Sequence, residues 1–384
     1  MKIKLIGSAI LFFVMMACTQ ADNLAEERAR RADKSTGDII IGAAAPWSEL
    51  QDGLWDGIEF AVQEINSSGG VLGRKIQVIK KDDKAAVSAG QIVAQQFAEN
   101  KDLIAVIGHY NSYVSIPASV IYEYYGLIML SPSSTSPKLT QQGFKLIFRN
   151  IPSDAVFGSE LADFCAKQGY KNMMIYHSNN EYGQGLANAF ETQAEQTGIA
   201  ILDRVDYDSL SGSRTFRKDL YYWKENFHFD AIFLAGVTPQ VSLFLIEARK
   251  LGIMIPVIGG EGLDTPELIN IAGKSAENTY VGSVFHTEVP IKKAHDFIQN
   301  FSEKYKVKPD SSAAQGYDTV NLLVYAIKKA KSTVPQKIAD ELHKLKKWDG
   351  VTGSHTFAQN GDIVDMDISI KIVKNGSFKY VTSQ

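Results

Sequence analysis

Residues 104–140 read IAVIGHYNSYVSIPASVIYEYYGLIMLSPSSTSPKLT, and this stretch decides the fold. The apolar runs at 104–107 and 127–130 have the composition of strands that are buried on both faces. Residues 113–125 between them have the pattern of a helix. A strand, a crossover helix and a second strand form the unit from which parallel α/β sheets are built.

Hydroxyl side chains follow both of these strands. Ser112 comes after the first strand, where the helix would begin, and Ser133 and Thr135 come after the second. Parallel strands end at the same edge of a sheet, so these residues should lie side by side at the edge where such sheets bind ligands. Hydroxyls and the free N–H groups of a helix start suit a carboxylate. Helix capping and turn formation are the alternative, and this segment alone favours it.

The same alternation of strands and helices continues along most of the chain and predicts two parallel α/β units. Strands are expected at residues 39–44, 76–80, 104–107, 127–130, 173–176, 201–207, 231–234, 257–259 and 279–284. Helices are expected at 54–67, 85–100, 113–125, 153–168, 183–197, 213–226, 239–251, 265–271, 292–305, 311–331 and 334–345. Residues 354–381 return to strands, with Asn-Gly turn signals at 360–361 and 375–376.

The N-terminus has the features of an export signal. Residues 1–17 carry two early lysines and a short apolar run that ends in Ala17, and Cys18 follows at the place of a bacterial lipoprotein cleavage site. An ordinary signal peptide that contains a cysteine is the alternative. Residues 18–37 are expected to be a lipidated cysteine and a polar tether, because they hold few large apolar side chains.

Composition and motifs exclude several classes of function. A formal charge of −3 gives no sign of nucleic-acid binding. No second apolar segment approaches membrane-spanning length, and Cys165 is expected to be a free buried thiol. The metal and hydrolase motifs that were sought are absent from the sequence, so we expect no metal, no cofactor and no enzymatic activity.

Several short motifs appear in the order found in one protein family. They are residues 57–66 with 69–74, Asp82-Asp83, 107–109, Ser131-Pro132, Tyr182-Gly183, 260–262 and 314–318. From about residue 39 to 381 the chain resembles periplasmic binding proteins of the leucine/isoleucine/valine-binding type, the solute receptors of ABC importers. The resemblance implies a type I binding-protein fold, with two doubly wound parallel-sheet lobes joined by a three-strand hinge.

The resemblance also assigns roles in holding an α-amino acid. Positions that match Ser112 and Thr135 bind the ligand carboxylate, and the position that matches Ser133 offers a backbone carbonyl to the ammonium group. Glu261 matches the acid that pairs with the ammonium from the second lobe, and Tyr182 matches an aromatic that covers the ligand. Helix capping ahead of Thr265-Pro266 is the alternative for Glu261.

Other positions are expected to surround the ligand side chain. They are Trp47, Leu50, Tyr110 and Val237, all apolar or aromatic. None of the four is Lys or Arg, which argues against a second carboxylate on the ligand. An apolar, branched-chain type of side chain is therefore expected, although hinge or core packing would suit the same residues.

The resemblance implies a division of the chain into lobes that close on the ligand. Lobe 1 is expected to comprise residues 38–152 and 286–353, and lobe 2 residues 153–285 and 354–384. Chain crossings are expected near 150–154, 284–287 and 352–357. The partners implied are an amino-acid ligand, an ABC permease with its ATPase subunits, and a membrane reached through the lipid anchor. The implied location is the bacterial cell envelope, facing the periplasm or the exterior.

Two alternatives stay open from the sequence. A sensory lipoprotein of the same fold would bind an amide or a small carboxylate and act through a signalling partner. A hydrolase would use His109 beside Ser112 as base and nucleophile, but a histidine that ends a buried strand is more often structural.

Overall fold

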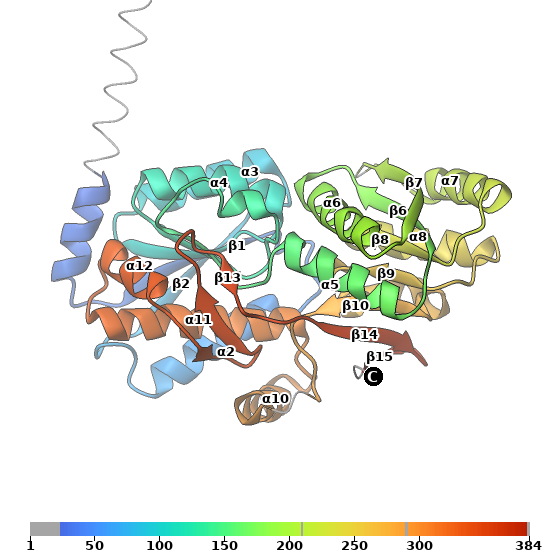
Figure 1. The fold of residues 1–384 in the computed structure, drawn as a ribbon. Coiled ribbons are helices and arrows are strands. Elements are labelled where there is room, and N and C mark those ends of the chain that lie inside the picture. The colour runs from blue at the N-terminus through green and yellow to red at the C-terminus, as the bar shows by residue number, and fades with distance from the viewer. Residues whose placement is uncertain (1–23, 209, 289–290, 382–384) are drawn as a thin grey trace, which may run out of the picture.

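The computed structural model describes residues 24–208, 210–288 and 291–381 and shows two α/β lobes side by side (Figure 1). The expected signal peptide and the lipidation site at Cys18 lie outside these residues. Within them, no helix is both long and apolar enough to cross a membrane.

The first lobe is built on a five-stranded sheet with the order β2-β1-β3-β4-β5, in which every pairing is parallel. Its strands are β1 (Ile39–Ala45), β2 (Ile76–Asp82), β3 (Leu103–Gly108), β4 (Ile128–Ser131) and β5 (Ile147–Arg149). Its helices include α2 (Leu54–Ser67), α3 (Val87–Glu99), α4 (Ser112–Tyr124), α11 (Ser311–Ala330) and α12 (Pro335–His343). Residues 103–108 are buried throughout, as a strand covered by helices on both faces requires.

The second lobe is built on a seven-stranded sheet with the order β15-β14-β10-β9-β8-β6-β7. Its parallel strands are β6 (Asn172–Ser178), β7 (Ala200–Tyr207), β8 (Ala231–Ala235), β9 (Val257–Gly259) and β10 (Thr279–Ser283). The last strands, β14 (Ser369–Lys374) and β15 (Ser377–Tyr380), join antiparallel through the predicted turn at Asn375-Gly376. Its main helices are α5 (Asp154–Lys167), α6 (Glu181–Gln196), α7 (Ser213–Asn226), α8 (Gln240–Lys250) and α9 (Pro266–Ala272).

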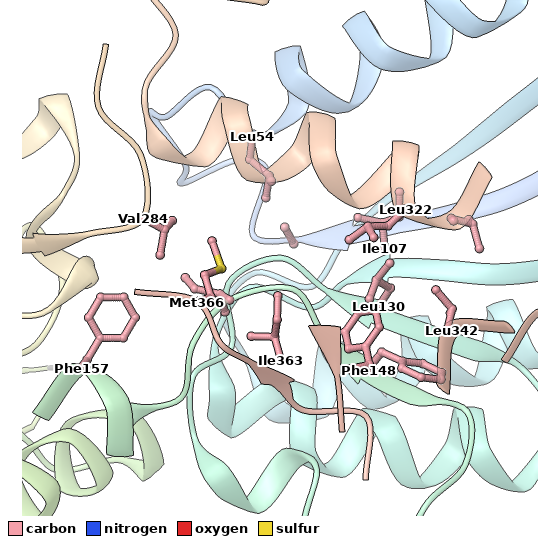
Figure 2. Packing of buried hydrophobic residues seen from close by; sticks show 14 of the residues in the cluster. Leu54, Ile107, Leu130, Phe148, Phe157, Val284, Leu322, Leu342, Ile363 and Met366 are labelled. Atoms are coloured by element: carbon pink, nitrogen blue, oxygen red, sulfur yellow. The ribbon is translucent and has the colours of Figure 1, made fainter. Parts of the chain in front are cut away.

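Two crossings of the chain between the lobes lie where the sequence predicts them. The chain leaves β5 at Arg149 and begins α5 at Asp154, and it returns from β10 at Ser283 to α10 (Lys292–Tyr305), whose aromatic face packs against Phe60 of the first lobe. One buried apolar cluster continues across both lobes: Figure 2 shows Leu130 and Phe148 of the first lobe together with Phe157 and Val284 near the crossings.

The third crossing lies later than expected. Residues 352–357 do not pass to the second lobe, because β12 (Ser354–Phe357) pairs with β11 (Trp348–Asp349) and β13 (Ile363–Val364) in a small antiparallel sheet. The Phe357 ring contacts Phe148 of the first lobe, and Arg149 N–H donates to the Gly361 carbonyl at 3.0 Å. The chain crosses only between β13 and β14. We therefore propose that lobe 1 extends to about residue 364.

The described part of the segment expected to be a polar tether, residues 24–37, contacts the first lobe. Residues 24–34 form a helix on the outer side of the first lobe (Figure 1). The side chain of Arg28 in this helix is fully buried and donates to four backbone carbonyls near the ends of α3 and α4: those of Ala98, Asn100, Leu103 and Tyr125. Ala98 and Tyr125 lie at the C-terminal ends of α3 and α4, where the last carbonyls have no intrahelical donor and the helix dipole favours a cation. The sequence pattern did not predict that this helix packs on the first lobe, because the hydrogen-bond partners of Arg28 lie 70 or more residues away in sequence.

Cys165 is the free, buried thiol that the sequence predicts. Burial raises its pKa, which keeps the thiol protonated and unreactive.

We expect Arg28→Leu to lower the free energy of unfolding by about 3 kcal/mol, because buried carbonyls left without a donor cost about 1–3 kcal/mol each. The exposed Arg30 on the same helix supplies the control, and Arg30→Leu should unfold at the wild-type urea concentration. Equal midpoints for wild type and both variants would show that the docked helix does not contribute to stability.

Candidate functional site

A cavity of about 440 Å³ lies between the lobes. It is lined by residues that follow β1, β3 and β4 of the first lobe and β6, β8 and β9 of the second. Seven of the predicted residues line it, and Thr135 and Trp47 are not in its lining: the seven are Leu50, Tyr110, Ser112, Ser133, Tyr182, Val237 and Glu261. The cavity therefore sits where the carboxyl ends of the strands in both sheets face one another, which is the usual ligand position in open α/β sheets.

The first-lobe side of the cavity carries the predicted hydroxyls. Ser112 is the first residue of α4, so its N–H belongs to the helix turn that has no intrahelical acceptor. Its hydroxyl oxygen accepts the Ser136 N–H at 3.2 Å, which ties the loop after β3 to the loop after β4. Thr135 in the second loop is fully buried. The two loops together provide hydroxyl and N–H donors at one edge of the sheet.

A buried network fixes the loop that presents Ser112. His109 Nδ1 lies 2.6 Å from Asp83 Oδ2, and His109 Nε2 lies 2.9 Å from the Tyr122 hydroxyl. The His109 carbonyl accepts from the Ser131 hydroxyl at 3.1 Å. Both ring nitrogens of His109 are thus engaged, so this histidine is not free to act as a base for Ser112. The arrangement supports the structural role of His109 over the hydrolase alternative.

Glu261 and Tyr182 form the second-lobe side. Glu261 begins a short 3₁₀ turn after β9, and its Oε1 accepts from the Thr135 hydroxyl at 3.4 Å, across the lobe interface. The Tyr182 hydroxyl accepts the Gly262 N–H at 3.2 Å, and a Cβ at Gly262 would lie only 2.7 Å from that hydroxyl. Capping does not explain Glu261, because the side chain of Thr265 caps the following helix by accepting the Glu267 N–H.

The electrostatics of this side are unusual. Oε2 of Glu261 is buried, and it accepts no hydrogen bond from the described residues. Asp154, at the start of α5, is fully buried; the Thr135 hydroxyl lies beside its carboxyl group, but no donor of the described residues meets either carboxyl oxygen in good hydrogen-bond geometry. Burial, followed by the negative charge of Asp154, raises the pKa of Glu261 to about 8. Burial likewise raises the pKa of Asp154 to about 7.

Trp47 does not line the cavity. Its ring meets Trp55 edge-on at 5.6 Å between centroids, and its Nε1 donates to the Lys81 carbonyl at 2.9 Å. Lys80 Nζ lies 4.6 Å from the Trp47 ring. These contacts hold the start of the loop at residues 46–52, several of whose other members, including Leu50, line the cavity. Trp47 thus supports the wall from behind, which corrects its predicted position.

Several polar residues of the cavity were missed by sequence reasoning. Asp52 accepts from the Tyr110 hydroxyl at 2.9 Å, and burial raises its pKa. Glu49, Lys84 and Glu267 also line the cavity. Asp52 could have been predicted from its place in the loop after β1. Ligands bind at the carboxyl ends of parallel strands, and this applies to the end of β1 as well as to the end of β3, which Ser112 follows. No comparable signal marks Asp154.

An exposed ion pair joins the lobes beside the cavity. Lys138 Nζ of the first lobe lies 2.7 Å from Glu181 Oε2 at the start of α6. Both side chains are more than a third exposed, so the pair adds little stability. Within the described residues, no group of three or more His, Cys, Asp or Glu side chains could hold a metal ion.

Comparisons with known proteins agree with this geometry. A family model described as "Periplasmic binding protein" matches residues 40–377. The Leu/Ile/Val-binding protein of Escherichia coli (strain K12) is 30% identical over 337 residues, which cover 86% of this chain and 89% of that protein.

Two solved structures have the same fold. An ABC transporter substrate-binding protein from Desulfitobacterium hafniense, in complex with Leu, is 42% identical with a TM-score of 0.81, and the match covers 90% of this chain and 100% of that chain. The branched-chain amino acid transporter substrate-binding protein LivJ from Streptococcus pneumoniae, in complex with isoleucine, is 28% identical with a TM-score of 0.81, covering 90% and 99%.

We expect His109→Phe to lower the free energy of unfolding by about 3–5 kcal/mol, because the buried Asp83 carboxylate would lose its ion-pair partner and keep only the Ala85 N–H at 3.0 Å among the contacts described for it. Tyr122→Phe removes only one hydrogen bond of the same network and should cost about 1 kcal/mol. Urea denaturation of both variants measures the difference. If both variants lost the same free energy of unfolding, the Asp83–His109 contact would contribute no more stability than a single hydrogen bond.

Proposed function

The chain belongs to the periplasmic binding protein family, and we propose that it is the solute-binding component of an ABC importer for an α-amino acid with an apolar, branched side chain. The observation that carries this proposal is the position of Glu261. Its carboxyl group lies at the lobe interface opposite Ser112 and Thr135, with no cationic side chain bonded to it among the described residues. A ligand ammonium would supply the missing positive charge.

The proposed binding mode places the two charges of a zwitterion on opposite sides of the cavity. The hydroxyls of Ser112 and Thr135 and the first N–H groups of α4 would donate to the ligand carboxylate. The Ser133 carbonyl and the Glu261 carboxylate would accept from the ammonium, and the Tyr182 ring would cover the ligand. Charged hydrogen bonds away from bulk water discriminate strongly against ligands that lack either group.

The proposed apolar side chain would lie against Leu50, Tyr110 and Val237, which line the same cavity. A volume of about 440 Å³ is within the usual range for small-molecule sites and has ample room for a leucine-sized ligand. The Leu and isoleucine complexes of the two similar structures support this choice of ligand class. Three acidic residues in the lining, Glu49, Asp52 and Glu267, argue against a second carboxylate on the ligand.

The proposed mechanism is closure of the lobes on the ligand. Ser112, Ser133 and Thr135 belong to the first lobe, and Tyr182 and Glu261 to the second, so a ligand that contacts both sets stabilises the closed conformation. The closed shape would then be recognised by a membrane permease with its ATPase subunits. Cys18 would anchor the protein by a lipid to the cell envelope, facing the periplasm or the exterior.

We expect leucine or isoleucine at a hundred times its dissociation constant to stabilise the protein by about 2.7 kcal/mol in a thermal-shift screen. Glu261→Gln should weaken leucine binding by at least about 30-fold, because losing one partner of a buried charged pair costs about 2–5 kcal/mol. Ser112→Ala should weaken it by about tenfold. Ser159→Ala is the control, because this hydroxyl bonds within α5 to the Val156 carbonyl. Shifts by amides or simple carboxylates, with none by amino acids, would contradict the proposal.

Small-angle X-ray scattering should detect the proposed closure as a smaller radius of gyration when leucine is added. The variant Glu261→Gln at the same leucine concentration is the control and should keep the radius of the empty protein. Identical scattering curves for the empty and leucine-saturated wild type would rule out closure by the ligand.

A further inference from the structure

Two buried carboxyl groups, those of Glu261 and Asp154, lie near enough for the charge of Asp154 to act on Glu261, and no cationic side chain of the described residues bonds to either. Glu261 comes from the turn after β9 and Asp154 from the start of α5. Three of their four oxygens, both of Asp154 and Oε2 of Glu261, are buried and accept no hydrogen bond from the described residues. Leaving a buried ionised oxygen without a partner is costly, so two ionised carboxylates are a poor description of the empty site.

The backbone holds Asp154 in this position. Its N–H donates to the Thr135 carbonyl at 2.8 Å, and the hydroxyl of the same Thr135 donates to Glu261. Gly185 of α6 leaves space for the carboxyl, since a Cβ at Gly185 would lie 2.8 Å from Asp154 Oδ2. Thr135, which binds the ligand carboxylate in the proposed function, therefore contacts both Asp154 and Glu261.

The charged and titratable neighbours do not neutralise the pair. Arg149 of β5 is the cation that acts on Asp154, but its guanidinium donates to Asp362 at 2.7 Å and to the Ser136 carbonyl at 2.6 Å. Tyr182 of α6 is the titratable group beside Glu261, and burial raises its pKa well above the ordinary value, so it stays neutral. A proton is the remaining means of neutralising one of the two carboxyls.

We propose that Asp154 is a positioning residue of the ammonium site: with Glu261 it holds one proton while the closed site is empty, and the ammonium of the ligand displaces that proton. This inference rests on the proposed function. The ligand enters as a zwitterion and keeps its three ammonium protons, and the proton of the carboxyl pair passes to solvent. In the bound state the ammonium contacts Glu261, and Asp154 acts through Glu261 rather than by touching the ligand.

The sign of the pH dependence follows from this exchange. Leucine and the proton compete for the same carboxyl pair, so affinity for leucine should rise about tenfold per pH unit at acidic pH and level off above about pH 8. Removing the Asp154 charge removes the repulsion that favours the proton on Glu261. The affinity of Asp154→Asn should therefore level off at a lower pH than that of wild type.

The test is isothermal titration calorimetry of leucine into wild-type protein at pH 7, in buffers with different ionisation enthalpies. We expect release of about one proton per leucine from wild type and clearly less from Asp154→Asn, in which burial alone still raises the pKa of Glu261. Asp163→Asn is the matched control: this residue lies on the same helix, and its carboxylate accepts from Gln193 outside the cavity, so it should behave as wild type. Leucine binding without proton release, or equal release from wild type and Asp154→Asn, would overturn the inference.

A second measurement needs no variant. Carboxyl ¹³C NMR of wild type at pH 7 should show the Glu261 signal moving from the protonated towards the ionised position as leucine is added. A Glu261 signal unchanged at saturation would overturn the inference while leaving the proposed function intact. Absence of any heat with leucine or isoleucine would instead refute the proposed function, and this inference with it.

Discussion

The Glu261 carboxyl group is the constraint on which the proposed site depends: it lies at the interface of the two lobes, and no cationic side chain in the described part of the chain bonds to it. Burying an unpaired charge costs several kcal/mol. A closed site with an ionised Glu261 and no ligand is therefore unfavourable, and a ligand ammonium removes that cost. The hydroxyl of Thr135, on the other lobe, contacts the same carboxyl group. We therefore propose that this pair of side chains couples the charge of the ligand to lobe closure.

The rest of the fold keeps the groups that face Glu261 rigid. The Asp83–His109–Tyr122 network fixes the loop after β3, and the contact between Ser112 and the Ser136 N–H joins it to the loop after β4. Preorganised donors bind a carboxylate more tightly because little ordering remains to be done on binding. In the proposed closure the lobes would move as units about the chain crossings, which would keep each half of the site intact while the cavity opens.

Sequence reasoning succeeded where one local rule decides the structure. Strand periodicity predicted the neighbouring parallel strands β3 and β4, and the structure places Ser112 and Ser133, which follow them, in the lining of one cavity. Sequence reasoning failed where distant contacts decide. The polar composition of residues 24–34 suggested a tether, but Arg28 finds carbonyls 70 or more residues away. Strand pairing keeps β12 on the first lobe. From the sequence, Asp154 is an ordinary acidic residue at the start of a helix. Only the folded structure shows that its carboxyl oxygens are buried without a hydrogen-bond donor among the described residues.

A crystal structure of the protein with leucine bound is the most direct test of the central claim. We expect the leucine carboxylate within hydrogen-bond distance of the Ser112 and Thr135 hydroxyls. We expect its ammonium within hydrogen-bond distance of Glu261, with both lobes in contact with the ligand. Leucine bound with its ammonium away from Glu261, or held by one lobe alone, would contradict the claim that this carboxyl group couples binding to closure.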